Sequence, residues 1–129
     1  MYQLRGKLSI VMPAYNEETL IYNSIMQTLS IVEQFAPDME IIAVNDGSKD
    51  KTKQEIERAI RDDEKQPHRV TAGMTVSKTR VKLVTSNKNR GKGNAIIAGV
   101  SQAEGDYIAF VDADLELNPA PVSYTHLTL

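Results

Sequence analysis

Two aspartates, Asp112 and Asp114, follow the apolar run YIAFV and stand one residue apart. In an extended chain alternate residues point the same way, so both carboxylates are expected on one side, just past a strand. Like charges at this spacing repel each other unless a cation compensates them. Mg²⁺ and Mn²⁺ prefer carboxylate oxygens and draw further ligands from water and phosphate. The pair is therefore typical of a divalent-metal site or of an exposed acidic turn, and the motif alone does not decide between the two.

Other motifs with similar letters fit this chain less well. A calcium-binding EF-hand loop requires glycine where Leu117 stands. Phosphatases with a D-x-D after an apolar strand resemble the segment locally, but Glu116 stands where they carry a small Thr or Val. The segment NRGKGN lacks the spacing of a Walker A loop, and Ile96 stands where a Rossmann fingerprint has its third glycine. A phosphatase remains a minor alternative.

Four further polar residues are candidates for binding a nucleotide. Asp46 can accept a hydrogen bond from a base N–H or a ribose hydroxyl, although an aspartate at a turn commonly caps it instead. Tyr15 can stack on a base or simply pack against the protein. Arg90 and Lys92 flank glycines where a pyrophosphate would fit, or they are solvated surface charges. Each candidate has an ordinary structural explanation when taken alone.

The elements that must position these residues alternate between strand and helix. Asn16 is expected to cap the first helix, with Glu17 and Glu18 in its first turn, and Pro37 and Asp38 to end it. Gly105 is expected to stop the third helix. The apolar patterns predict strands at 8–12, 39–46, 81–85 and 106–112, further helices at 51–65 and 94–104, and a surface loop at 66–80.

This β-α-β-α-β-α-β order predicts an open, mostly parallel α/β sheet. Such sheets bind ligands at the carboxyl ends of their strands. All four predicted strand ends carry polar segments, which read PAYNEE, NDGSKD, SNKNRGKG and DADLE. The candidates from distant parts of the chain are therefore expected to meet at one edge of the sheet.

Composition excludes several other classes of function. The 129 residues suffice for one domain, 41% of them are hydrophobic and 25% charged, and the net charge is −2. There is consequently no basic field for nucleic acid, and the absence of cysteine excludes disulfides, thiolate metal sites and cysteine nucleophiles. No apolar run approaches the roughly 18 residues of a membrane span, and no signal peptide is evident. The expected compartment is the cytoplasm.

Taken together and in order, three segments resemble a known family. SIVMPAYNEE, AVNDGSKDKT and NRGKGNAIIAGVSQAEGDYIAFVDADLELNP are similar to the N-terminal half of a family 2 glycosyltransferase with the GT-A fold, over residues 7–119. The subgroup that the chain resembles is the dolichyl- or polyprenyl-phosphate mannose or glucose synthases. The resemblance implies an inverting transferase with a UDP- or GDP-sugar donor, Mg²⁺ or Mn²⁺, and a polyprenyl-phosphate or saccharide acceptor. It also implies work at the cytoplasmic face of a membrane.

The resemblance also implies roles for individual residues. Asp114 would be the direct metal ligand, Asp112 would face the metal or the ribose, and Asp46 would read the edge of the base. The other implied donor-binding residues are Pro13, Tyr15 and Glu17 around the base and ribose, and Arg90, Gly91 and Lys92 in a loop near the nucleotide. The cation would neutralise charge as the nucleotide leaves.

The chain also departs from the family pattern. No later Asp or Glu matches the family's catalytic base, and the acceptor-side strands have no counterpart. We therefore expect residues 1–122 to be a donor-binding part with its last strand left unpaired or uncovered. Residues 123–129 form a tail that does not match the family. The chain as given is expected to be incomplete and inactive alone, and the alternative is a non-catalytic nucleotide-binding module or an inert fragment.

Overall fold

Uninterrupted apolar runs form the centre of the sheet. The computed structural model describes residues 4–66, 79–114 and 126–128. Strands β1 (Leu8–Ala14) and β2 (Met39–Asp46) are buried along almost their whole length, because each has strands on both sides and helices over both faces. The other strands are β3 (Val81–Ser86), β4 (Tyr107–Phe110) and β5 (His126–Thr128), and the order across the sheet is β3-β2-β1-β4-β5. The first four strands are parallel, so the expected open, mostly parallel sheet is confirmed.

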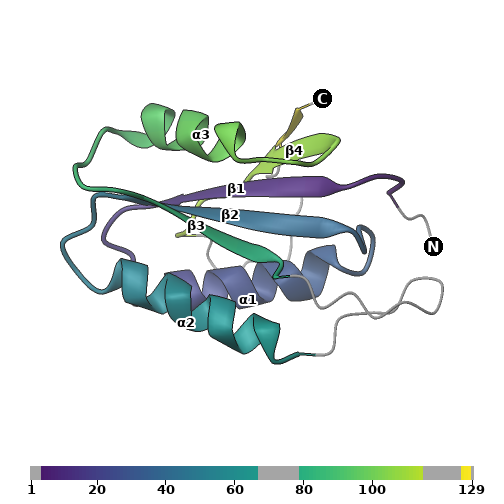
Figure 1. Cartoon of the computed structure of the whole chain (residues 1–129), viewed down its shortest axis with the longest axis horizontal. Coiled ribbons are helices and arrows are strands. Elements are labelled where there is room, and N and C mark those ends of the chain that lie inside the picture. The colour runs from purple at the N-terminus through teal and green to yellow at the C-terminus, as the bar shows by residue number, and fades with distance from the viewer. Residues whose placement is uncertain (1–3, 67–78, 115–125, 129) are drawn as a thin grey trace.

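Helices cover the two faces unequally. Helices α1 (Ile21–Val32) and α2 (Thr52–Glu64) lie together on one face, and α3 (Lys92–Ser101) lies alone on the other (Figure 1). An apolar stripe of α1, formed by Ile21, Ile25, Leu29 and Val32, is buried against the sheet, and Ile56 and Ala59 form a thinner buried stripe on α2. Helix α3 packs through the small residues Ala95 and Gly99.

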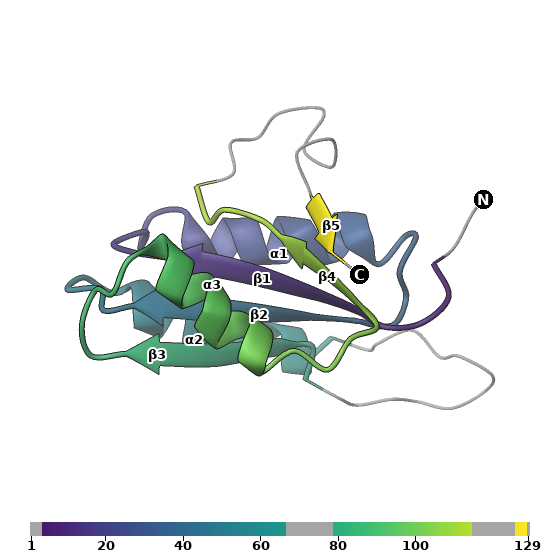
Figure 2. The same ribbon diagram turned by 90° about the horizontal axis from the view of Figure 1, so that it is seen from above.

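The loops that carry the candidate residues emerge at one end of the sheet. Figure 2 shows the segments after β1, β2, β3 and β4 on the same side, because the four strands point the same way. The register pairs Ala14 with Asn45, and Asp46 with Ser86, so the ends of β1, β2 and β3 are level. The predicted meeting of distant polar segments is therefore confirmed at the level of the backbone.

The expected start of the first helix was wrong. Helix α1 begins at Ile21 after Leu20, and no side chain caps it. Glu17 lies in a turn ahead of the helix, where its carbonyl accepts hydrogen bonds from the amides of Leu20 and Ile21. Asn16 adopts a left-handed backbone with φ of 52°. Four residues thus separate Asn16 from the helix, and the acidic residues Glu17 and Glu18 precede its first turn.

The third helix also differs from its predicted range of 94–104. It runs from Lys92 to Ser101, so Gly105 does not end it. A side chain at Gly105 would lie 2.5 Å from the Ser9 hydroxyl and 2.8 Å from the Lys7 carbonyl. Glycine is needed here because the chain passes close to β1, which local helix signals do not reveal.

The last predicted strand is shorter than expected, and its outer edge is not free. Strand β4 ends at Phe110, and β5 pairs antiparallel with it from Ile108 to Phe110. The expectation of an unpaired last strand was therefore wrong over those residues, because part of the tail at 123–129 forms β5. Most of the predicted loop at 66–80, Glu116, Leu117 and the domain boundary at 122 lie outside the described residues.

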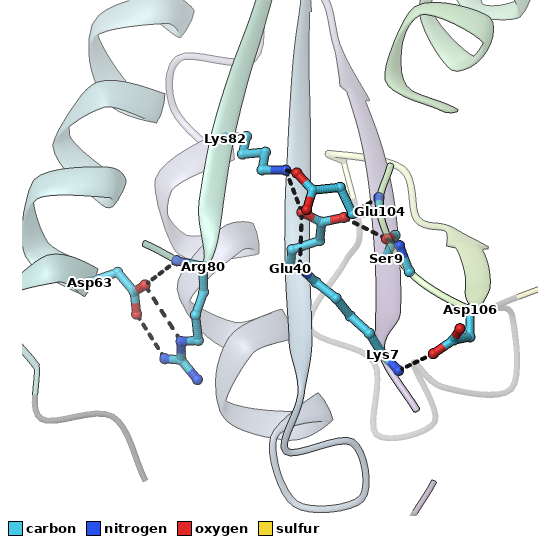
Figure 3. Close-up of polar contacts among 9 residues, drawn as sticks. Lys7, Ser9, Glu40, Asp63, Arg80, Lys82, Glu104 and Asp106 are labelled. Atoms are coloured by element: carbon cyan, nitrogen blue, oxygen red, sulfur yellow. Dashed lines mark hydrogen bonds and ion pairs between the residues drawn. The ribbon is translucent and has the colours of Figure 1, made fainter. Parts of the chain in front are cut away.

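A buried carboxylate ties the amino ends of three strands together (Figure 3). The side chain of Glu40, at the start of β2, is only 2% exposed. Its Oε2 accepts hydrogen bonds from the Ser9 hydroxyl at 2.6 Å and from the Glu104 amide at 2.8 Å. Its Oε1 lies 2.8 Å from the Lys82 ammonium and 3.8 Å from that of Lys7. This group lies at the opposite end of the strands from the polar loops.

The Glu40 contacts predict a loss of stability in acid. Burial acts to raise the pKa of Glu40, but the bonds from Lys82, Ser9 and the Glu104 amide, with the charge of Lys7, outweigh it and lower the pKa. A lowered pKa stabilises the fold above about pH 4.3, the unfolded value, and this contribution is lost as the pH falls through the folded pKa. Urea unfolding from pH 7 down to 3 should show this loss.

Glu40→Gln should lower the free energy of unfolding at pH 7 by about 2 kcal/mol, and should flatten its fall below pH 4.3. Glu104→Gln is the matched control, because that exposed side chain binds the same Lys82. It should cost clearly less than Glu40→Gln, because solvent screens an exposed pair. Equal losses in the two variants would contradict a special role for the buried carboxylate.

Two glycines of α3 should respond oppositely to alanine. A side chain at Gly99 would overlap Val11 Cγ1 and lie 3.0 Å from Val44 Cγ2, whereas one at Gly93 would meet nothing within 4 Å. Gly99→Ala should therefore destabilise the fold by about 1–3 kcal/mol through overpacking. Gly93→Ala should stabilise it by about 0.5–1 kcal/mol through helix propensity. Thermal or urea unfolding measures both, and shifts of the same sign would contradict this packing of α3.

Candidate functional site

A pocket of about 430 Å³ opens at the carboxyl ends of β1, β2 and β4. Its position follows from the strand order, because the chain builds β2 and β3 on one side of β1 and then crosses to β4 on the other. In open α/β sheets ligands bind at such a switch point. The β1–β4 ladder ends at Val11 and Phe110, just before Pro13, which has no N–H to donate. The two strands are thus unpaired beyond this point, where the pocket lies.

The pocket collects residues from the segments after β1, β3 and β4 and from the last residue of β2. Of the predicted site residues, those that line it are Pro13, Tyr15, Glu17, Asp46, Gly91, Lys92, Asp112 and Asp114. Arg90 does not; it lines a neighbouring groove of about 880 Å³ between β3 and α3. The tyrosine side chain is 40% exposed, so it is available to a ligand.

The segment after β4 presents its two aspartates outward. Asp112 and Asp114 are exposed, while Ala113 between them is 2% exposed. The Ala113 carbonyl accepts a hydrogen bond from the buried Ser24 hydroxyl of α1 at 2.7 Å. This contact turns Ala113 inward, and both carboxylates line the pocket. The D-x-D motif gave no sign of Ser24, which lies 89 residues away along the chain.

The pocket carries an excess of negative charge. Burial raises the pKa of Glu17, and the carboxylates of Asp114, Asp50 and Asp112 raise it further. Within the described ranges, no group of three or more carboxylate, histidine or cysteine side chains is arranged to hold a metal ion. Two carboxylates nevertheless fit Mg²⁺ or Mn²⁺, which commonly take one or two from the protein and the remainder from water and substrate phosphates. Asp112 and Asp114 are the two exposed carboxylates among the described residues of the lining and could supply these ligands.

Asp46 holds the loop NRGKG in place. Its side chain is buried, and its Oδ1 and Oδ2 accept hydrogen bonds from the amides of Arg90 at 2.9 Å and Gly91 at 3.1 Å. Gly91 has φ of 93°, a conformation that favours glycine. A carboxylate can accept about four hydrogen bonds, so Asp46 retains capacity for a ligand. The sequence indicated a base-reading or turn-capping role and missed this contact with a segment 44 residues away.

The loops after β1 and β2 are locked to each other. The Asn16 amide donates to the Ser48 hydroxyl and the Asn16 Oδ1 accepts from the Lys49 amide, each at 2.9 Å. The Glu17 amide donates to the Thr52 hydroxyl at 2.8 Å. These contacts explain the left-handed conformation of Asn16, and they fix the wall of the pocket that carries Tyr15 and Glu17. Ser48 and Thr52 belong to the segment NDGSKDKT, but the sequence assigned them no function.

Lys92 reaches across the pocket to the first aspartate. Its ammonium lies 2.6 Å from Asp112 Oδ1, and the two side chains are 61% and 51% exposed. It is the first residue of α3 and stands between Gly91 and Gly93, at neither of which a side chain would meet anything within 4 Å. The ion pair links the loop after β3 with the segment after β4.

Comparison with known proteins identifies the family of the chain. The model of the family "Glycosyl transferase family 2" matches residues 9–123. The undecaprenyl-phosphate 4-deoxy-4-formamido-L-arabinose transferase of Proteus mirabilis (strain HI4320) is 31% identical over 117 residues, which cover 91% of this chain and 32% of the relative. The uncharacterized glycosyltransferase YkcC of Bacillus subtilis (strain 168) is 33% identical over 111 residues, which cover 86% of this chain and 30% of the relative.

Solved structures show the same fold. The mannosyltransferase PcManGT from Pyrobaculum calidifontis, in complex with GDP-Man and Mn²⁺, superposes with a TM-score of 0.66 at 24% identity, covering 86% of this chain and 28% of that one. S. aureus TarS 1–349 in complex with UDP gives a TM-score of 0.59 at 28% identity, covering 84% and 27%. The GT-A type of sheet that the resemblance implied is thereby confirmed.

The match is limited to part of each relative. The chain spans about a third of the length of the curated relatives that it matches. None of the described helices is long and apolar enough to cross a membrane. With the family model matched over most of its residues, the chain belongs to glycosyltransferase family 2.

Proposed function

We propose that this chain is the donor-binding part of a glycosyltransferase that uses a UDP- or GDP-sugar together with Mg²⁺ or Mn²⁺. The observation that carries the proposal is the pocket at the switch point between β1 and β4, where two exposed aspartates face loops fixed by Asp46 and Asn16. One solved structure with this fold contains GDP-Man and Mn²⁺, and another contains UDP. Membership of the family also disfavours the phosphatase interpretation of the D-x-D motif.

Different residues around the pocket would bind different parts of the donor. Tyr15 and Pro13 would contact the base and ribose, and the remaining acceptor capacity of Asp46 would read a base N–H. The loop at Gly91 and Lys92 would face the diphosphate, with Arg90 at its outer side. Backbone amides and a lysine are suitable partners for phosphate oxygens.

A cation would complete the electrostatics of the pocket. Asp114 and Asp112 would hold Mg²⁺ or Mn²⁺, which would supply charge neutralisation for the departing nucleotide diphosphate. The chain's own residues would bind and orient the donor and keep the loop after β3 in register with the aspartates. Glu17, whose pKa is raised by burial and by Asp114, Asp50 and Asp112, lies in the same lining.

The acceptor is proposed from the relatives. Several of them are named as undecaprenyl-phosphate transferases, so a polyprenyl phosphate is the favoured acceptor and a saccharide the second choice. An acceptor phosphate is already anionic and needs no base to deprotonate it. We place the reaction at the cytoplasmic face of a membrane, where a lipid-linked acceptor would be presented.

A second candidate function is a nucleotide-binding module without catalysis, or an inert fragment. The chain spans about a third of the length of the relatives that it matches, so the activity of those whole proteins does not exclude this second candidate. Nucleotide binding by this chain tests the donor-binding proposal against inertness, and sugar transfer by a protein of the relatives' full length tests it against a module.

Calorimetric titration with UDP and GDP should show binding that depends on Mn²⁺. Asp114→Asn should weaken binding in Mn²⁺ at least about tenfold, because a metal ligand is lost, and should change little in EDTA. Asp38→Asn is the control, since this aspartate lies at the amino end of β2, away from the pocket. Binding that ignores both Mn²⁺ and Asp114→Asn would refute the proposed site.

Asp46→Asn should loosen the loop after β3 and weaken nucleotide binding together. An asparagine oxygen can replace one of the two acceptors, but its NH₂ group would face an amide donor. Hydrogen exchange at the amides of Arg90 and Gly91 should accelerate, and the nucleotide Kd should rise about tenfold. Asp106→Asn, whose carboxylate accepts the Lys7 amide at the other end of the sheet, is the control. Unchanged exchange at both amides would show that Asp46 does not hold the loop.

A further inference from the structure

The ion pair between Lys92 and Asp112 occupies one of the two aspartates that the pocket offers to a metal. The ammonium lies 2.6 Å from Asp112 Oδ1. Because both side chains are more than half exposed, the contact is solvated, weak and readily exchanged. The Lys92 side chain is 61% exposed, so it is free to take another partner.

The charges around the pocket give this lysine a special position. Its lining contains the carboxylates of Glu17, Asp112 and Asp114, besides Asp46, whose oxygens accept two amides. Lys92 supplies the one cationic side chain among the described residues of that lining. In the free protein it therefore balances part of the charge that a divalent cation would otherwise balance.

A divalent cation and an ammonium at the same carboxylate repel each other. A metal ion that arrives alone must therefore displace Lys92 into solvent. A metal ion that arrives with a diphosphate offers the ammonium new anionic oxygens next to the site. When the metal arrives alone, the displaced lysine loses its anionic partner. When the metal arrives with a diphosphate, the lysine exchanges the carboxylate for a phosphate oxygen and keeps an anionic partner.

Resting on the proposed donor site, we propose that Lys92 is an exchangeable counter-ion of Asp112 that couples metal binding to diphosphate binding. Without nucleotide it competes with the metal, and with nucleotide it moves to the diphosphate. The chain should consequently bind Mn²⁺ poorly alone and well together with UDP or GDP. Lys92 is a binding and positioning residue in this scheme and performs no covalent step.

The test measures Mn²⁺ affinity by electron paramagnetic resonance, first without nucleotide and then with saturating GDP or UDP. Lys92→Met should bind Mn²⁺ alone about 3–10-fold more tightly than the unchanged chain, and should bind the nucleotide in Mn²⁺ about 5–30-fold more weakly. Lys92→Arg should restore both affinities to within about threefold, because it keeps the charge. Lys88→Met is the matched control, since this nearby lysine lines the neighbouring groove between β3 and α3. It should change neither the Mn²⁺ affinity nor the nucleotide affinity.

The outcomes separate this inference from the proposed function. If Lys92→Met binds Mn²⁺ alone no more tightly than the unchanged chain does, the proposed exchange of Lys92 between Asp112 and the diphosphate is overturned. This holds even where nucleotide binding is lost. Equal effects of Lys88→Met and Lys92→Met also overturn it, because they would reflect net charge alone. If the unchanged chain binds nucleotide and Mn²⁺ while Lys92→Met behaves like it, the donor site stands and the exchange falls. If the unchanged chain binds neither, both fall.

Discussion

The parallel pairing of β1 with β2 on one side and β4 on the other is the constraint on which the candidate site depends. Residues from four distant segments meet only because the carboxyl ends of these strands face the same way. The chain reverses its direction of growth across the sheet at β1, and the ladder to β4 stops short of Pro13. Pairing and its interruption together produce a crevice between the two strand ends.

Buried polar contacts then convert this arrangement of strands into a defined pocket. Asp46 ends a fully buried strand, and its cost of burial is offset by the two amides that it binds. The hydrogen bonds of Asn16 join the loops after β1 and β2, and Ser24 fixes the backbone between the two aspartates. The charged side chains at the mouth are left exposed and free to exchange partners, which suits a site for a charged ligand.

Most of the fold, and the meeting of most candidate residues at one edge of the sheet, could be predicted from the sequence. Continuous apolar runs such as LSIVM indicate buried parallel strands, and the alternation with amphipathic helices fixes their sequence of connections. The predictions that were wrong failed for physical reasons. Asparagine is a residue type that often caps helices, but the Asn16 side chain accepts a hydrogen bond from the Lys49 amide of a neighbouring loop instead. Gly105 looks like a helix stop, but it is required by close approach to β1.

The partners within the site could not be predicted, because they are long-range. Nothing near Asp46 in the sequence points to the amides of Arg90 and Gly91, and nothing near Asp112 points to the ammonium of Lys92. Local patterns identify which residues are polar at strand ends. The three-dimensional contacts decide which of them support a loop and which remain open to a ligand.

The most direct test of the central claim is to locate the metal by NMR, using paramagnetic broadening by Mn²⁺ in the presence of GDP or UDP. We predict that amide signals of Ala113, Asp114, Gly91 and Lys92 broaden first, while those around Glu40 at the other end of the sheet stay sharp. Broadening centred on the Glu40 end, or spread evenly over the acidic surface, would contradict a donor site between β1 and β4.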